Sequence, residues 1–233
     1  MRLFAIGDLH MSGGDEKPMD IFGPQWDRHF FRIAENWRCA VEEDDAVLIP
    51  GDISWAMRLE AAAPDLEEIG KLPGRKIICR GNHDYWWNSI SRVRDALPEG
   101  MKAVQNDAAD LGHTVVCGTR GWTIPAPGQQ LSPDDEKIYV RETRRLRLAL
   151  ESAAAVADGR PVTVMTHFPP LSPGAMDTGF TALMEEFRVK DAVYGHLHGE
   201  GIAQGFDGEH NGVRYHLVSC DSIGFAPALI AEW

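Results

Sequence analysis

Five short apolar runs, each followed at once by carboxylate, amide or imidazole side chains, constrain this chain more than any other feature. The third run is the clearest, because residues 76–80 stop at the sequence Gly81-Asn82-His83-Asp84. Short apolar runs bounded by glycine are typical of buried strands, and glycine lets the chain turn sharply where a strand ends. One such cluster is also typical of an ordinary polar turn. A single cluster would therefore not identify a site.

The other four runs repeat the same design. They are residues 2–7, 46–50, 162–165 and 192–194, and they lead to Asp8 and His10, to Asp52, to His167, and to His196 and His198. Buried polar groups without partners are costly, so core packing does not explain five such strand ends. Ligands of this kind, with no thiolate, suit Mn²⁺, Fe, Co²⁺ or Zn²⁺. About seven ligands are too many for one ion and fit two ions that share a carboxylate.

The intervening segments alternate between helix and strand. Apolar residues recur with a helical period over 26–41 and 59–70, and further helices are predicted at 89–97, 132–158 and 178–188. Strand, helix, strand is the unit of a parallel sheet. Residues 102–119 read as strands without a helix, which predicts antiparallel pairing and a second sheet. A hairpin is expected between 202–206 and 213–220.

Two long loops, 11–25 and 118–131, contain several glycines and prolines. We interpret the first as a flap near the site and the second as a wall of a pocket. Four arginines lie within two turns of the 132–158 helix: Arg141, Arg144, Arg145 and Arg147. We interpret them as a solvated face with ion pairs rather than as a binding patch.

Composition narrows the classes of protein. The 233 residues carry a net charge of −12, and no block of Lys or Arg could follow a phosphate backbone, which disfavours non-specific nucleic-acid binding. No apolar run approaches the roughly 18 residues needed to span a bilayer. Four widely spaced cysteines without a Cys-x-x-Cys pair fit a reducing cytoplasm. With no linker visible, we expect a single domain over residues 1–233.

The ordered set Asp-x-His, Gly-Asp, Gly-Asn-His-Asp, His and Gly-His-x-His resembles the calcineurin-like metallophosphoesterase superfamily and covers residues 8–198. The resemblance implies an α/β fold, a two-sheet mixed β-sandwich flanked by helices. It also implies two divalent transition-metal ions, with Mn²⁺ favoured and Fe, Zn²⁺ or Co²⁺ as alternatives. One ion would be held by Asp8, His10, Asp52 and His198, and the other by Asp52, Asn82, His167 and His196. Asp52 would bridge them.

The implied reaction is hydrolysis of a phosphoester by attack of a metal-bridging hydroxide in line with the leaving group. His83 is not needed as a ligand and would act as general acid or as a cation beside the leaving oxygen. Asp84 would fix the tautomer of His83. His113, His210 and His216 match no part of the motif set, and we expect surface or hairpin positions for them.

The sequence departs from the protein serine/threonine phosphatases of this superfamily, which continue Gly-Asp with two residues and then Asp-Arg-Gly. Here Trp55 and Ala56 follow instead. Arg80 or Arg120 would replace the missing phosphate contact. Tryptophans near the motifs (Trp55, Trp86, Trp87 and Trp122) are core by default; if Trp122 or another lines the mouth, the pocket would select a compact phosphoester.

Three functions therefore compete. The first is hydrolysis of a small phosphomonoester or phosphodiester. The second is a nuclease with the same bimetallic site, which would need a cationic strand channel. The third is a non-catalytic scaffold, for which seven ligands and His83 would have no use. The first fits the chain best, whereas the physiological substrate and the oligomeric state stay open.

Overall fold

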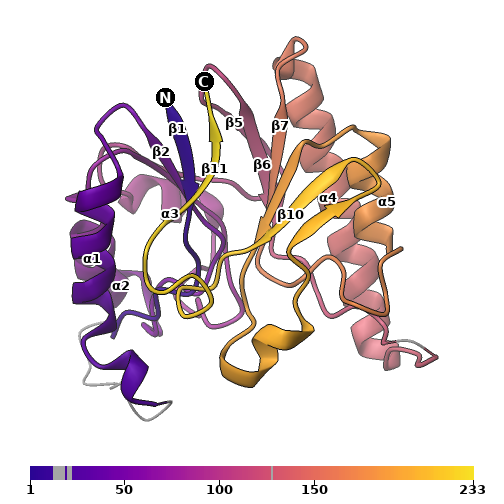
Figure 1. Ribbon diagram of the computed structural model, residues 1–233, viewed down its shortest axis with the longest axis horizontal. Helices are drawn as coiled ribbons and strands as arrows, with labels where there is room; N and C mark the ends of the chain where they lie inside the picture. Colours follow the sequence, from indigo (N-terminus) through magenta and orange to yellow (C-terminus); the bar gives the residue numbers. More distant parts are fainter. Residues whose placement is uncertain (13–18, 20–22, 127) are drawn as a thin grey trace.

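The computed structural model describes residues 1–12, 19, 23–126 and 128–233. Two β-sheets pack face to face, and helices cover the outer face of each sheet, so the layers run α/β/β/α (Figure 1). The expected two-sheet sandwich is confirmed. Much of the first loop, residues 13–18 and 20–22, lies outside the described residues, and so does the flap proposed there.

The first sheet has the strand order β11-β1-β2-β3-β4. Its members are β11 (Ala228–Glu232), β1 (Arg2–Ala5), β2 (Ala46–Ile49), β3 (Arg75–Ile78) and β4 (Met101–Ala103). The strands β1 to β4 are parallel, and β11 pairs antiparallel with β1. Four parallel strands therefore end at the same edge of this sheet.

The second sheet has the order β5-β6-β7-β8-β10-β9. Its members are β5 (Ala108–Asp110), β6 (Val115–Thr119), β7 (Val162–Thr166), β8 (Asp191–Tyr194), β9 (Gly208–His210) and β10 (Val213–Leu217). Strands β6, β7, β8 and β10 are parallel to one another. The edge strands β5 and β9 pair antiparallel with β6 and β10. The sheet is therefore mixed.

Helices α1 (His29–Ala40), α2 (Leu59–Gly70) and α3 (Ile90–Ala96) lie over the first sheet, and α4 (Pro133–Ala157) and α5 (Gly179–Glu186) over the second (Figure 1). The longest helix starts as its sequence predicts, because the Ser132 hydroxyl accepts the Asp135 N–H at 3.1 Å and Pro133 occupies the first turn. Short 3₁₀ turns occupy Pro24–Trp26 and Gly199–Gln204.

Three layers of buried apolar side chains hold this arrangement together. One lies between α1–α3 and the first sheet and includes Ile33, Trp37 and Leu66. A second lies between the second sheet and α4 and α5. The third, with Leu3, Val116 and Val193, fills the space between the sheets. Both faces of the parallel strands are therefore covered, which explains their continuous apolar runs.

Several sequence-based boundaries were wrong. Residues 101–103 join the first sheet parallel to β3 instead of pairing antiparallel, and only β5 and β6 pair as expected. The first arm of the hairpin is β9, because most of 202–206 lies in or next to the 3₁₀ turn. The first helix begins at His29, and β11 was not predicted. In the described part of the chain, no helix is both long and apolar enough to cross a bilayer.

Candidate metal centre

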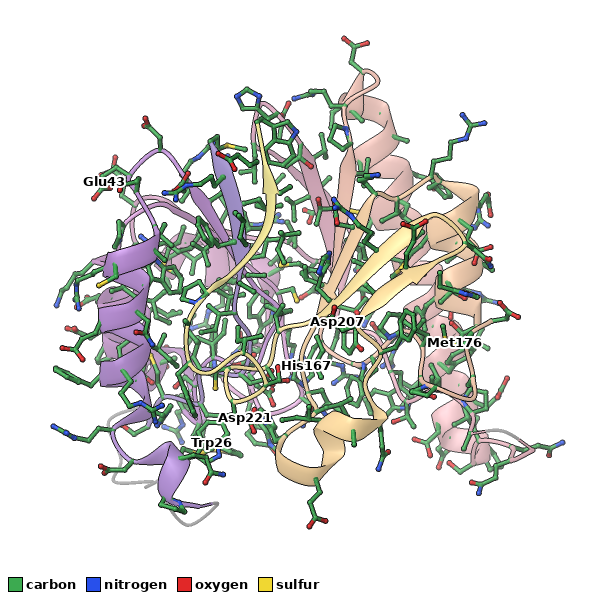
Figure 2. All side chains as sticks on the ribbon, in the orientation of Figure 1. Trp26, Glu43, His167, Met176, Asp207 and Asp221 are labelled. Carbon is green, nitrogen blue, oxygen red and sulfur yellow. The ribbon has the colours of Figure 1, made fainter. Side chains whose placement is uncertain are left out.

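The predicted ligands converge where the parallel strands of both sheets end. Figure 2 labels His167, which follows β7, and Asp221 and Trp26, all toward the edge where these strands end. Asp8, Asp52 and His167 are almost completely buried. The loops after five strands thus bring together all seven side chains that the motifs single out.

The first group of possible ligands contains Asp8, His10 and His198. Nε2 of His198 lies 3.4 Å from Nε2 of His10 and 3.4 Å from Oδ1 of Asp8. The other ring nitrogen of His198 is 2.8 Å from Oδ1 of Asp221, so Nδ1 carries the proton that is donated to this carboxylate. Nε2 consequently faces the group.

The second group contains Asp8, Asp52 and His167, with Asn82 and His196 beside them. Nε2 of His167 lies 2.6 Å from Oδ1 of Asn82, 3.2 Å from Nδ1 of His196 and 3.4 Å from Oδ2 of Asp52. Oδ2 of Asp52 is also 3.8 Å from Nε2 of His10. This carboxylate therefore lies between the two groups.

Hydrogen-bond chemistry in the second group fits a bound cation. Nδ1 of His167 lies 3.0 Å from the Pro50 carbonyl oxygen, which can only accept, so Nδ1 carries the ring proton. In the neutral ring, Nε2 is then an acceptor that faces the acceptor Oδ1 of Asn82. In the first group, Nε2 of His10 faces Nε2 of His198 at 3.4 Å and Oδ2 of Asp52 at 3.8 Å. Divalent ions held by these nitrogens and oxygens would satisfy the converging acceptors.

Burial sets the charge state of the imidazoles. It lowers the pKa of His10 to about 3 and that of His196 to about 4. Both rings are neutral at pH 7, the form that binds metals. Burial also acts to lower the pKa of His198, but hydrogen bonds to Asp221 and Asp8 outweigh it and raise this pKa to about 10. Burial, reinforced by Asp84 and Asp8, raises the pKa of Asp52 to about 7.

The backbone is unusual at four of the seven predicted ligands. Asp8, His10, Asp52 and His196 have φ angles of 60°, 43°, 51° and 75°. Such left-handed conformations cost on the order of 1–3 kcal/mol each for residues other than glycine and concentrate at functional sites. A side chain at Gly81 would overlap the carboxylate of Asp52, so glycine is required there. The loops are therefore shaped to present these side chains, at a cost that the surrounding fold must offset.

Asp84 has a role that the sequence did not predict. Its buried carboxylate accepts five N–H donors at 2.7–3.2 Å, from the backbones of Gly81, Asp52, Ile53 and Ser54 and from the indole of Trp86. No hydrogen bond joins it to the His83 ring among the described residues. The expectation that Asp84 fixes the His83 tautomer is revised, because both carboxylate oxygens are already occupied. Asp84 is a positioning residue that ties the loop after β2 to the loop after β3.

His83 lies at the mouth of the centre, outside both ligand groups. Its backbone N–H donates to Oδ1 of Asp52 at 2.8 Å, and its half-buried ring is 4.5 Å from the Trp55 ring between centroids. Burial, with the charges of His167 and His198, lowers its pKa despite the nearby Asp84 and Asp8. A lowered pKa makes the protonated ring a stronger acid.

A cavity of about 270 Å³ opens onto this side of the centre. Its lining includes His10, His83, His198, Trp26 and Trp55. Trp26, which the helical pattern assigned to the core, is buried and also lines the cavity. Trp86 and Trp87 are fully buried core residues, as predicted.

The three predicted substrate contacts, Arg80, Arg120 and Trp122, do not line the mouth cavity. The two arginines line a different cavity, and the guanidinium of Arg120 stacks on the Trp122 ring at 4.6 Å. His113 is exposed, and His216 and His210 pair with Asp191 and Asp177. Asp221 was missed because it follows β10, whose sequence Val-Arg-Tyr-His-Leu alternates apolar and polar residues and so does not match the apolar runs of the other strand ends.

A two-sheet sandwich whose strand ends gather carboxylates, an amide and imidazoles is the arrangement expected of a metal-dependent phosphoesterase. The profile of the family described as "Calcineurin-like phosphoesterase" matches residues 1–200, and the chain belongs to this family. The resemblance expected from the motifs is confirmed. Enzymes of this family use divalent metal ions.

Solved structures share the fold at low sequence identity. A phosphopantetheinyl hydrolase from Mycobacterium tuberculosis is similar with a TM-score of 0.58 and 15% identity, over 100% of this chain and 96% of that chain. A protein of unknown function from Aquifex aeolicus is similar with a TM-score of 0.51 and 13% identity, over 98% and 95% of the two chains. No curated protein matches the sequence.

The bonds to Asp84 predict a large effect of Asp84→Asn on stability. The amide oxygen can replace one carboxylate oxygen, but the NH₂ group cannot accept the remaining N–H donors. Hydrogen bonds to charged groups contribute about 1.5–3 kcal/mol each, so we expect the free energy of unfolding of the metal-free protein to fall by at least about 2 kcal/mol. Urea denaturation measures this, with the exposed Asp44→Asn as matched control. Equal stabilities of the two variants would contradict the positioning role.

If Nε2 of His198 coordinates a metal ion, its raised pKa predicts that a proton is released on binding. Its folded-state pKa of about 10 keeps the ring protonated at pH 7, whereas coordination through Nε2 needs the neutral ring. Metal affinity should therefore rise with pH from 6 to 9, and the enthalpy of Mn²⁺ binding should depend on the ionisation enthalpy of the buffer. Asp221→Asn removes a hydrogen bond that raises this pKa, so fewer protons should be released. A buffer-independent enthalpy in the wild-type protein would contradict the assignment.

Proposed function

We propose that this chain is a binuclear-metal phosphohydrolase that cleaves a small phosphomonoester or phosphodiester. The observation that carries the proposal is the position of Asp52, whose Oδ2 has a histidine nitrogen on either side, at 3.8 Å and 3.4 Å. A shared carboxylate between two groups of ligands is the arrangement that two ions about 3.5–4 Å apart require.

The proposed first site consists of Asp8, His10, Asp52 and His198, and the second of Asp52, Asn82, His167 and His196. Asp8 is also near His167, but the nitrogen that faces it, Nδ1 at 3.8 Å, already donates to Pro50. Asp52 is therefore the better bridge. The ligand types favour Mn²⁺, with Fe, Zn²⁺ or Co²⁺ as alternatives. Bound ions would supply a water of lowered pKa as nucleophile and would offset the charge of the phosphoryl oxygens.

His83 supplies the proton in this proposal. Its ring lines the mouth cavity, and the hydrogen bond from its backbone to Asp52 fixes its position relative to the ligands. A protonated His83 would donate to the leaving oxygen as the ester bond breaks. General acid catalysis of this kind contributes roughly 10²–10⁴ in rate.

The shape of the mouth supports a small substrate. Trp26 and Trp55 flank His10 with centroid distances of 6.2 Å and 4.9 Å and make the cavity largely apolar. A cavity of about 270 Å³ suits a compact organic leaving group. The name of one structural neighbour, a hydrolase of a phosphopantetheinyl group, agrees with this class. A net charge of −12 disfavours the nuclease alternative.

Metal counting and substrate comparison test the proposal. We expect two Mn²⁺ ions per wild-type chain by elemental analysis after loading and dialysis, and fewer than two in Asp52→Asn, because the shared carboxylate is lost. The loaded wild-type enzyme should hydrolyse p-nitrophenyl phosphate or its bis-ester with kcat/KM at least tenfold above that for single-stranded DNA ends. A single ion at full occupancy would remove the bridging argument, and faster cleavage of DNA would support the nuclease.

If His83 is the general acid, the loss of kcat in His83→Ala should depend on the leaving group of the substrate. His83→Ala should retain both ions and lose at least tenfold in kcat for an alkyl phosphate, which needs a proton on its leaving oxygen. The loss should be smaller for p-nitrophenyl phosphate, whose leaving group departs as an anion. The exposed His113→Ala is the matched control. Loss of metal in proportion to activity would instead make His83 a ligand.

A further inference from the structure

A second cavity, of about 300 Å³, lies beside the metal centre and is lined by cationic side chains. Arg80 and Arg120 enter it from the segments after β3 and β6, and Arg141 and Arg145 enter it from α4. We call these four residues and their cavity the arginine pocket. Four guanidinium groups converge here in a protein that is otherwise strongly acidic.

One carboxylate, Glu142, also lines the arginine pocket. It is fully buried and already bound, to the Thr119 hydroxyl at 2.7 Å, to Arg145 at 2.7 Å and to Arg141 at 3.4 Å. Four positive charges against one negative charge leave three positive charges uncompensated. The interpretation of the α4 arginines as a solvated face with ion pairs holds for Arg141 and Arg145, which pair with Glu142, and for Arg147, which pairs with Glu186. Arg141 and Arg145 line the cavity in addition.

The other two arginines have no carboxylate within ion-pair distance among the described residues. Nε of Arg80 is buried and lacks a hydrogen-bond partner in this part of the chain. The Arg120 side chain contacts the Trp122 ring, and burial lowers its pKa, with Arg80, Arg141 and Arg145 adding to this effect against Glu142. Partly buried cations without counter-ions are unfavourable. An anionic ligand would relieve this cost.

We propose that the arginine pocket binds a phosphate-type dianion next to the metal centre. Guanidinium groups present planar pairs of N–H donors that match phosphate oxygens. Gln105 and Asn106 also line the cavity and carry amide groups that can donate.

The arginine pocket adjoins one side of the metal centre. Arg80 is two residues before Asn82, and the backbone carbonyl of Arg120 accepts the N–H of His167 at 2.9 Å. The mouth cavity is lined instead by His10, His83 and His198. The dianion is either a second phosphate of the substrate, which rests on the proposed function, or a free phosphate ion. The recognising chemistry is the same for both.

Equilibrium dialysis with radiolabelled inorganic phosphate tests the proposal on the Mn²⁺-loaded protein. We expect two equivalents bound by the wild-type chain, one at the metals and one in the arginine pocket. Asp52→Asn disrupts the metal centre and should retain one equivalent. Loss of all phosphate in Asp52→Asn would overturn the proposal. One equivalent bound both by the wild type and by Asp52→Asn would support the arginine pocket and would mean that the metals bind no phosphate.

Substitutions in the arginine pocket identify where the remaining equivalent binds. In the Asp52→Asn background, adding Arg120→Gln or Arg141→Gln should weaken phosphate binding at least tenfold. Neither change leaves a carboxylate unpaired, because Arg120 has no ion pair and Glu142 keeps Arg145. Arg144→Gln, exposed on the same helix, is the matched control. Unchanged binding in Arg120→Gln and Arg141→Gln would overturn the proposal, with thermal denaturation confirming that each variant is folded.

Kinetics then distinguishes the two sources of the dianion. If the substrate supplies it, a nucleoside 3′,5′-bisphosphate should show kcat/KM at least tenfold above the 5′-monophosphate, and Arg141→Gln should abolish this preference. If free phosphate supplies it, the two substrates should react equally. If no substrate is hydrolysed but Asp52→Asn still binds one phosphate, the proposed function is refuted and the proposal for the arginine pocket is still supported.

Discussion

The arrangement of the candidate metal centre depends on the hydrogen bonds of the buried Asp84 carboxylate. This carboxylate collects N–H groups from the loop after β2 and from the loop after β3, and so fixes the distance between Asp52 and Asn82. A neutral side chain could not accept all five donors, and water has no access to replace it. The glycine at 81 completes this constraint, because a larger residue would push the two loops apart.

The ligands could be predicted from sequence because each follows an apolar run, and parallel strands deliver such residues to one edge. His10 and His196 show this directly. The role of Asp84 could not be predicted, since a carboxylate beside a histidine in sequence contacts the histidine or turns away depending on the backbone. The edge strand β11 was missed because its burial is uneven, with Ile230 alone well buried. The arginine pocket was missed because Glu142, its internal counter-ion, looks like a surface residue of an amphipathic helix.

The two sides of the centre differ in chemistry. The side of His10 and His198 opens into an apolar cavity with Trp26 and Trp55, whereas the side of Asn82 and His167 adjoins four arginines. A phosphoester bound between them would place its organic part in the apolar cavity and any further anionic group beside the arginines. Specificity of this kind comes from the placement of uncompensated charge and does not need a cationic surface overall.

The left-handed backbone at Asp8, His10, Asp52 and His196 is set by the folded chain itself. The fold of the chain therefore shapes the loops that carry these four predicted ligands. Selectivity among similar divalent ions depends on site geometry and ligand type more than on raw affinity, so a frame of fixed shape would restrict which ions fit. The metal that the enzyme carries would then depend on the shape of these four loops as well as on the supply of ions in its surroundings.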